Sequence, residues 1–239
     1  YAGITSSFYK KGEKFFVRTD GPDGKLTEYE IAYTFGFFPL QQYLIQFPNG
    51  RYQALSIAWD SRAKAEGGQR WFHLYPNEKV DSKDVLHWTR ISQNWNYMCA
   101  ECHSTDLKKN YNPESRTFDT KWSEISVGCE SCHGPGSLHQ AWAKDPKRLE
   151  NKASNGLVYS LRSPAFEAKH DPATDKTLPA AALSKPQEIN MCARCHSRRS
   201  VLTENYSYGK SLLDTHMPSW LTAGEYHDDG QIDDEVYEY

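Results

Sequence analysis

One five-residue pattern, Cys-x-x-Cys-His, decides the fold by occurring three times: Cys99-Ala100-Glu101-Cys102-His103, Cys129-Glu130-Ser131-Cys132-His133 and Cys192-Ala193-Arg194-Cys195-His196. The three copies contain all six cysteines of the chain. This spacing is the signature of covalent c-type haem attachment. Two sulfurs three residues apart lie on one face of a helical turn, so each can form a thioether to the same haem. The histidine that follows then binds the iron as proximal ligand, which predicts three c-type haems.

Other chemistries also use paired cysteines. One Cys-x-x-Cys can be a redox dithiol, two can form a zinc site, and a secreted chain can use its cysteines in disulfides. None of these explains why a histidine follows the second cysteine in every copy, with no cysteine left over. Haem attachment therefore accounts for more of the pattern than the alternatives do.

The composition suits a chain that packs around a prosthetic group. Apolar residues make up 38% of the 239 residues, below the usual range for a globular domain, and aromatic residues make up 13%. A porphyrin is itself a large apolar core element, and aromatic side chains pack well against its faces and edges. The length indicates one large or two modest domains.

The charge distribution and hydropathy exclude two classes of partner. The formal net charge is −3, and no Lys/Arg block suggests a nucleic-acid partner. No stretch approaches the eighteen or so apolar residues of a membrane span. The chain begins with Tyr1 and carries no signal peptide, so we expect an export signal that was removed or lies upstream. Because c-type haem is attached outside the cytoplasm, we predict a periplasmic or extracellular protein.

We predict an α+β fold: an N-terminal antiparallel β meander followed by a haem-packed region of short helices and irregular loops. Residues 10–76 have strand character, with a turn cluster at Thr19–Gly24 and a hairpin turn at Pro48-Asn49-Gly50. The predicted domains are therefore a β-rich subdomain at 1–80 and a three-haem cytochrome domain at 81–239. This second region has too little protein to insulate three haems from one another, so we expect them to pack closely.

Short helices should lead to the haem motifs. We expect one from Asp81 or Ser82 towards Tyr97, one from Ser137 to Trp142 or Ala143, and one from Ser184 into the third motif. Residues 144–186 are rich in Lys, Asp, Pro, Ala and Ser, and we expect a surface excursion there with a short strand at Leu157–Leu161.

Six histidines remain after the proximal ones, enough for a second axial ligand on every iron. The distal candidates are, in falling order, His139, His216, His87 and His227. His139 ranks first because it follows the turn Gly134-Pro135-Gly136 after the second motif, which leads it towards a neighbouring haem. His73 and His170 rank lower.

Three arginines flank the third motif and are candidates for pairing with haem propionates: Arg194, Arg198 and Arg199. A solvated charged face explains these arginines equally well.

Five stretches of the chain are similar to bacterial multihaem c-type cytochromes, a family often fused to tetratricopeptide repeats. Its more distant relatives are the tetrahaem cytochrome of ammonia oxidisers and hydroxylamine oxidoreductase. The stretches are Phe15–Gly24, Leu40–Leu44, Asn94–Thr105, Val127–Ser137 and His227–Ile232. Family members carry further haem motifs upstream and downstream, and these are absent here, as is any tetratricopeptide pattern. We therefore expect a section of a longer polypeptide, with some distal ligands supplied from elsewhere.

Electron transfer is the favoured function, ahead of catalysis, because two axial imidazoles leave no substrate position on an iron. The partners would then be redox proteins or neighbouring haem subunits. One alternative is a haem-dependent oxidoreductase of nitrogen or sulfur oxyanions, which needs one open iron. The other is a subunit of an extracellular haem polymer, in which case the chain forms oligomers or polymers.

Overall fold

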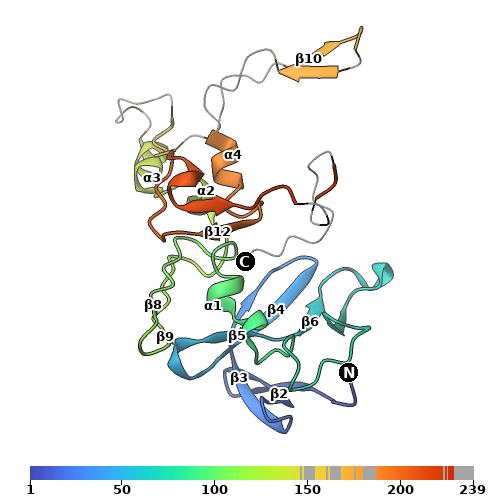
Figure 1. Ribbon diagram of the computed structural model, residues 1–239. Coiled ribbons are helices and arrows are strands. Elements are labelled where there is room, and N and C mark those ends of the chain that lie inside the picture. The colour runs from blue at the N-terminus through green and yellow to red at the C-terminus, as the bar shows by residue number, and fades with distance from the viewer. Residues whose placement is uncertain are drawn as a thin grey trace. The chain divides into compact units, whose positions relative to one another are not determined.

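The computed structural model describes residues 1–145, 147, 154–159, 161, 168–174, 176–179, 187–222, 224 and 226–228. The chain forms two compact units, Tyr1–Val127 and Gly128–Tyr239 (Figure 1). The strands are β1 Ser7–Lys11, β2 Lys14–Asp20, β3 Leu26–Phe35, β4 Leu40–Gln46, β5 Tyr52–Ala54, β6 Ile57–Asp60, β7 Arg70–His73, β8 Tyr111–Asn112, β9 Thr117–Phe118, β10 Ala168–Asp171, β11 Lys176–Pro179, β12 Arg199–Val201 and β13 His216–Pro218. The α-helices are α1 Trp95–Met98, α2 Cys129–His133, α3 Ser137–Lys144 and α4 Gln187–Cys192, and the 3-10 turns are η1 Pro48–Gly50, η2 Lys64–Glu66, η3 Ile91–Gln93 and η4 Leu212–Asp214.

The first unit is built on a seven-stranded antiparallel sheet. Its strands follow the order β1-β2-β3-β4-β6-β7, with β5 paired to β4. The predicted turn after Thr19 joins β2 to β3, where the amide of Gly21 donates to the carbonyl of Lys25 at 2.9 Å. The turn Pro48-Asn49-Gly50 is η1 and connects β4 to β5. Turn residues with positive φ therefore set the order of these strands.

The sheet is curled, and a ring pair links the two ends of the strand order. Phe8 on β1 and Trp71 on β7 stack with ring centroids 3.9 Å apart and an angle of 10° between the ring planes. A register shift between β3 and β4, at Ile31 and Tyr33, marks a β-bulge. Bulges increase local twist and bend a strand, which favours this curling.

Strand β4 contributes to two separate clusters of buried side chains. Tyr43 and Ile45 pack with Val17, Leu55 and Trp88 in the first cluster. Leu44, whose side chain points to the opposite face, packs in the second cluster with Phe35, Ala54, Trp95 and Ala100. Ala100 lies inside the first Cys-x-x-Cys-His pattern, so this second cluster ties that pattern directly to the sheet.

The predicted α+β fold class is wrong, because the chain is mostly β. The four α-helices are only four to eight residues long, and the described residues do not form a haem-packed helical region. Each haem motif occupies a single helical turn instead of the end of a long helix. Turns of this length give too little surface to build a helical layer.

Two local expectations also failed. The predicted helix between Asp81 and Tyr97 is a run of turns, in which the carboxylates of Asp81 and Asp84 accept from the amides of Lys83 and Leu86. Such side-chain bonds compete with helix formation. The strand expected at Leu157–Leu161 is absent among residues 157–159 and 161.

The other segment predictions had mixed outcomes. Helix α3 begins at Ser137, as predicted, although Ser137 lies inside the helix and does not cap it. Ser184 and much of the 144–186 excursion fall outside the described residues. The domain division at residues 80 and 81 stays a prediction.

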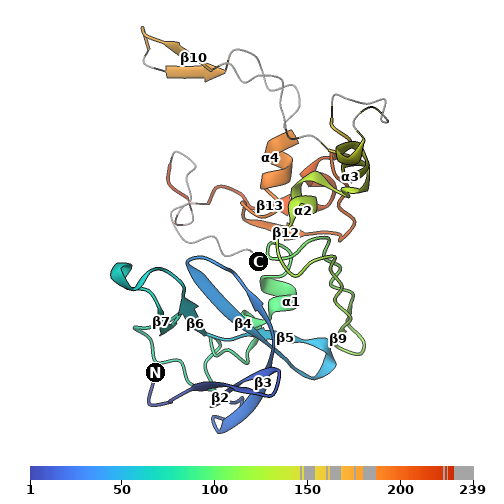
Figure 2. The same ribbon diagram turned by 180° about the vertical axis from the view of Figure 1, so that it is seen from behind.

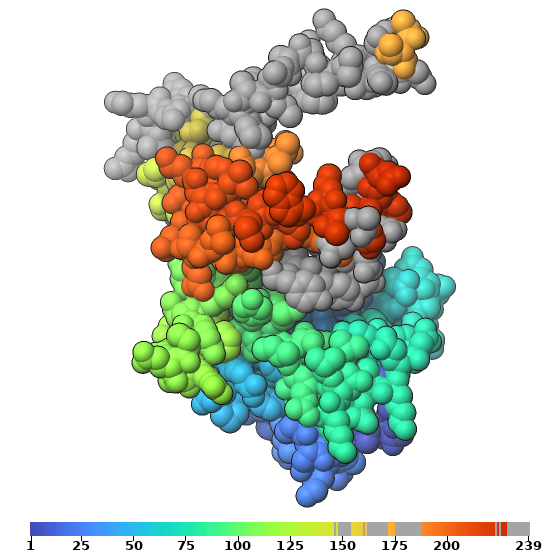
Figure 3. All heavy atoms as spheres, viewed as in Figure 1, coloured from blue at the N-terminus to red at the C-terminus, as the bar shows by residue number. Residues whose placement is uncertain are grey.

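In the second unit, α2 and α4 lie beside the hairpin β12–β13 in both ribbon views (Figures 1 and 2). The space-filling view shows residues 187–218, orange to red, gathered into one packed body (Figure 3). Among the described residues, no helix has the length and apolar character needed to cross a membrane.

Candidate functional site

All three Cys-x-x-Cys-His patterns adopt a helical turn. In the first, the amide of His103 donates to the carbonyl of Cys99 at 3.1 Å. In the third, the amide of His196 donates to the carbonyl of Cys192 at 2.8 Å. The second pattern is the whole of α2. The predicted helical spacing of the paired cysteines is therefore present three times.

The first and third turns share an additional hydrogen bond. The hydroxyl of Ser197 donates to the carbonyl of Ala193 at 2.6 Å, and Ser104 makes the same contact with Ala100. The second motif has Gly134 at this position, with a φ of +71°. A Cβ there would lie 3.1 Å from the ring of Tyr208, so the close approach of this ring also favours glycine.

The first motif is anchored to the sheet by buried amide side chains. Asn94 caps α1 by accepting from the amide of Tyr97 at 3.1 Å, and its Nδ2 donates to Oε1 of Gln53 at 3.2 Å. Gln53 in turn donates to the carbonyls of Trp88 and Arg90, at 2.9 and 2.8 Å. These bonds fix the start of the turn that carries Cys99.

Asn96 adds a second set of bonds. Its Oδ1 accepts from the amide of Tyr52 at 2.6 Å, and its Nδ2 donates to the carbonyl of Gly50 and to Thr120 at 3.1 and 2.8 Å. Asn94 and Asn96 carry the positioning of the first motif, and no role was predicted for them from the sequence. The signal was present, because an Asn directly before a short helix is a common N-cap.

The ring of His103 lies edge-on to Phe35 of β3, with centroids 5.6 Å apart. The side chain is exposed overall, yet the protein around the ring disfavours its charged form and lowers the pKa of His103 below its usual 6.5. A neutral imidazole is the form that binds iron.

The second and third motifs are linked within the second unit. Arg194 of the third motif donates from Nη1 to the carbonyl of Ser131 in the second, at 3.2 Å. Burial raises the pKa of the Cys132 thiol, and the nearby Cys195 and Cys192 raise it further. Thiols from two different motifs are thus close enough to influence each other.

His133, at the end of α2, has a buried ring nitrogen. Its Nδ1 makes no hydrogen bond to any described residue. A buried polar atom without a partner is costly, and such atoms often mark a functional site. The role of His133 as an iron ligand stays a prediction.

Three distal candidates, His139, His216 and His227, lie in the same unit as the second and third motifs, and the first two make side-chain hydrogen bonds. His139 on α3 stacks on Trp142, and its Nδ1 bonds to the carbonyl of Asn155 at 2.7 Å. That bond places the proton on Nδ1 and makes Nε2 an acceptor, which is the tautomer a metal ligand requires. His216 is 1% exposed, and its Nδ1 bonds to the hydroxyl of Thr215 at 2.8 Å.

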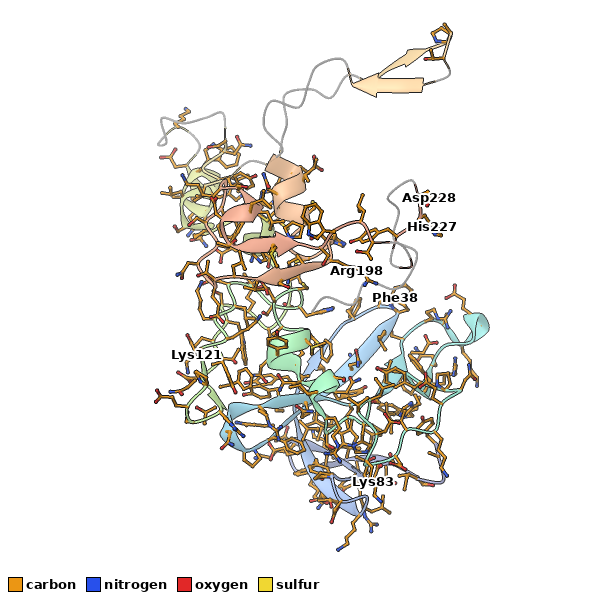
Figure 4. All side chains as sticks on the ribbon, in the orientation of Figure 1. Phe38, Lys83, Lys121, Arg198, His227 and Asp228 are labelled. Carbon is orange, nitrogen blue, oxygen red and sulfur yellow. The ribbon has the colours of Figure 1, made fainter. Side chains whose placement is uncertain are left out.

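The remaining histidines are in different settings. His87 is buried with both nitrogens engaged, Nδ1 with Thr89 at 2.8 Å and Nε2 with Asp20 at 3.1 Å. His73 stacks on Tyr1, with centroids 3.4 Å apart. His227 is exposed on the segment after β13 (Figure 4). His170 lies on β10.

The arginines near the third motif have distinct contacts. Arg199 is 5% exposed, and its Nε donates to the carbonyl of Arg194 at 2.8 Å. Arg198 directly precedes β12 (Figure 4). Pairing of these side chains with propionates stays a prediction.

The donor groups fit haem. None of the six cysteines is in a disulfide. Among the described residues, no group of three or more His, Cys, Asp or Glu side chains is arranged to hold a metal ion. A haem iron takes four ligands from the porphyrin and needs only one or two from the protein, so single histidines beside paired thiols suffice.

A protein-family model for cytochrome c554 and c-prime matches residues 57–134, about a third of the chain. The matched stretch contains the first two Cys-x-x-Cys-His patterns. No curated protein and no solved structure matches the chain. The family match supports a c-type cytochrome that carries electrons on haem. The closer resemblance to proteins fused to tetratricopeptide repeats, and the distant one to hydroxylamine oxidoreductase, stay predictions.

Proposed function

We propose that this chain is a multihaem c-type cytochrome that transfers electrons through three covalently bound haems. The observation that carries the proposal is the recurrence of one helical turn at all three Cys-x-x-Cys-His patterns. A turn that places two thiols on one face and a histidine directly after them meets the requirement of c-type attachment.

The proposed attachment residues follow from these turns. Thioethers would form at Cys99 and Cys102, at Cys129 and Cys132, and at Cys192 and Cys195, with His103, His133 and His196 as proximal ligands. A bound haem supplies an iron that cycles between the ferric and ferrous states by one electron. The protein supplies the axial ligands and the surrounding charge, which set the potential of that iron.

For the distal ligands, the geometry favours His139 and His216. Both are in the unit that contains the second and third motifs, and the Nδ1 of each is engaged in a hydrogen bond. Such a bond orients a ligating imidazole, and the carbonyl partner of His139 also fixes its tautomer. His139 would serve a haem other than the one bound by His133.

A second candidate function rests on the first motif. Within the described part of the first unit, the other histidines are His73 and His87, and His87 is bonded through both ring nitrogens. The first iron would then stay open to a small ligand unless a histidine from the second unit or another chain reaches it. An open iron is what an oxidoreductase of nitrogen or sulfur oxyanions would require.

The setting that we propose is the periplasm or the cell exterior, where c-type haem is attached, with redox proteins or neighbouring haem subunits as partners. Residues 81–239 would form the haem-bearing part. The family match supports electron transport as the general role.

The test is to count haems in the intact chain and in matched variants. Pyridine haemochrome absorbance and intact mass should give three haems per chain. The pairs Cys99→Ser/Cys102→Ser, Cys129→Ser/Cys132→Ser and Cys192→Ser/Cys195→Ser should each remove one. A colourless chain that binds zinc would contradict the proposal. Carbon monoxide added to the reduced protein separates the two functions. An unchanged Soret band indicates electron transfer alone. A Soret shift equivalent to one haem, which is lost in Cys99→Ser/Cys102→Ser, indicates an open first iron.

A further inference from the structure

Arg194 and Ser131 occupy the same position in two different motifs, directly before the second cysteine. The guanidinium of Arg194 donates from Nη1 to the carbonyl of Ser131 at 3.2 Å. One side chain of the third motif therefore reaches the backbone of the second.

Aromatic rings hold the guanidinium in place. Its central carbon lies 4.3 Å from the ring centroid of Tyr206 and 5.8 Å from that of Tyr208, within the range of cation–π attraction. Tyr208 also packs closely on Gly134, the residue after the second motif. The charge is thus held between the two attachment turns.

We propose that Arg194 is a positive charge shared by the second and third haem sites, which joins their attachment turns and favours the reduced state of both irons. This inference rests on the proposed function, because it requires haem at both motifs. Reduction adds one negative charge to each site, and a nearby fixed cation stabilises that added charge. Removing the cation should therefore lower both reduction potentials.

This role differs from the propionate pairing expected from the sequence. Propionate pairing of Arg194 would concern a single haem, whereas a charge that belongs to the third motif and contacts the backbone of the second acts on two. Burial strengthens the effect, because charge interactions are weakly screened away from water.

The first motif provides a matched control. Glu101 occupies the same position there as Ser131 and Arg194, and Lys109 approaches it with an Nζ–Oε2 distance of 3.5 Å. Both side chains are largely buried, at 12% and 16% exposure. Substituting Lys109 removes one positive charge beside the first haem site only.

The experiment is a spectroelectrochemical titration of the holoprotein. Arg194→Gln should lower two of the three midpoint potentials by about 59 mV, which corresponds to a tenfold fall in the reduced-to-oxidised ratio at a fixed potential. Arg194→Lys keeps the charge, so its midpoint potentials should stay close to those of the wild type. Lys109→Gln should lower only the one midpoint that Arg194→Gln leaves unchanged, which belongs to the first haem site. That midpoint should be missing from Cys99→Ser/Cys102→Ser.

Arg194→Met, which replaces the charge with a flexible apolar side chain that can pack on aromatic rings, serves as a second neutral variant if Arg194→Gln loads fewer than three haems. A shift of one midpoint or none in a three-haem neutral variant would overturn the role of Arg194. So would an equal shift in Arg194→Lys, because that pattern indicates lost packing. A wild-type chain without haem would instead overturn the proposed function, and this inference with it.

Discussion

The side-chain amides of Gln53 and Asn94 meet in the protein interior, with 3.2 Å between Oε1 and Nδ2. Gln53 is 0% exposed and Asn94 is 1% exposed. One residue belongs to β5 and the other caps α1, so this contact joins the sheet to the turn that carries the first pair of cysteines.

Gln53→Ala should destabilise the protein by about 2–4 kcal/mol. The substitution removes the donor that reaches the carbonyls of Trp88 and Arg90, and the Arg90 carbonyl still accepts from the amide of Gln93 at 3.1 Å. An unsatisfied buried group costs about 1–3 kcal/mol, and the cavity left by the missing side chain adds to this cost. The measurement is the free energy of unfolding from urea titration. Gln69→Ala is the control, because exposed Gln69 also donates to two carbonyls, and its loss should cost under about 1 kcal/mol. Equal losses for the two variants would show that burial of the amide is unimportant.

Gly50→Ala should cost about 3 kcal/mol or more. Gly50 has a φ of +72°, and a Cβ there would lie 1.9 Å from the carbonyl oxygen of Phe118. Gly67→Ala measures the cost of a positive φ alone, because Gly67 has a φ of +83° and nothing lies within 4 Å of the added Cβ. This substitution should cost about 1–2 kcal/mol. Thermal unfolding of both variants measures the difference. If the two variants unfold at the same temperature, a Cβ at residue 50 does not clash with the carbonyl of Phe118.

His139→Ala should open one iron. With three haems still attached, the reduced variant should bind one more carbon monoxide per chain than the wild type, seen as a larger Soret change. His170→Ala is the comparison, since His170 ranked lowest as a ligand on sequence grounds, and it should match the wild type. An unchanged carbon monoxide stoichiometry in His139→Ala would rule out His139 as a distal ligand.

Stability should fall as the pH drops from about 6.5 to about 4, in part because of His73. Burial lowers the pKa of His73 from 6.5 to about 4. Over this interval the unfolded chain binds a proton that the folded chain does not, so acid favours unfolding, and above pH 6.5 the effect is absent. The full shift corresponds to about 3 kcal/mol, and solvent screening of this half-buried ring reduces it to about 1–2 kcal/mol.

The check is the urea midpoint of the wild type and of His73→Gln at pH 7 and pH 4.5. The variant should lose less stability on acidification than the wild type does. Identical pH dependence in both proteins would mean that His73 titrates normally in the folded state.

The sequence predicted the local geometry of the haem motifs because that geometry follows from spacing alone. Cys99 and His103 are four residues apart, and one helical turn brings them together whatever surrounds them. The tertiary contacts of these turns could not be predicted from the sequence. That Arg194 contacts Ser131, 63 residues earlier, depends on how α2 and α4 pack, and no local pattern carries that information.

The fold class failed for a related reason. The residues before the first motif contain good capping residues, and Asp81 was interpreted as the start of a helix. The carboxylates of Asp81 and Asp84 instead accept from backbone amides two residues later, which gives successive turns. Local propensity supports both outcomes, and the tertiary bonds of Gln53 to the carbonyls of Trp88 and Arg90 favour the turns.

The alternation of β4 between two buried clusters makes its pairing register decisive for the surroundings of His103, the proposed ligand of the first iron. A slip by one residue would exchange the side chains of Tyr43 and Leu44 between the two faces. Phe35 and Ala100, which pack around Leu44, would lose their neighbour, and His103 would lose the support that Phe35 gives its ring. The alignment of one seven-residue strand therefore determines whether the imidazole that we propose as axial base is held in a fixed orientation before any porphyrin is attached.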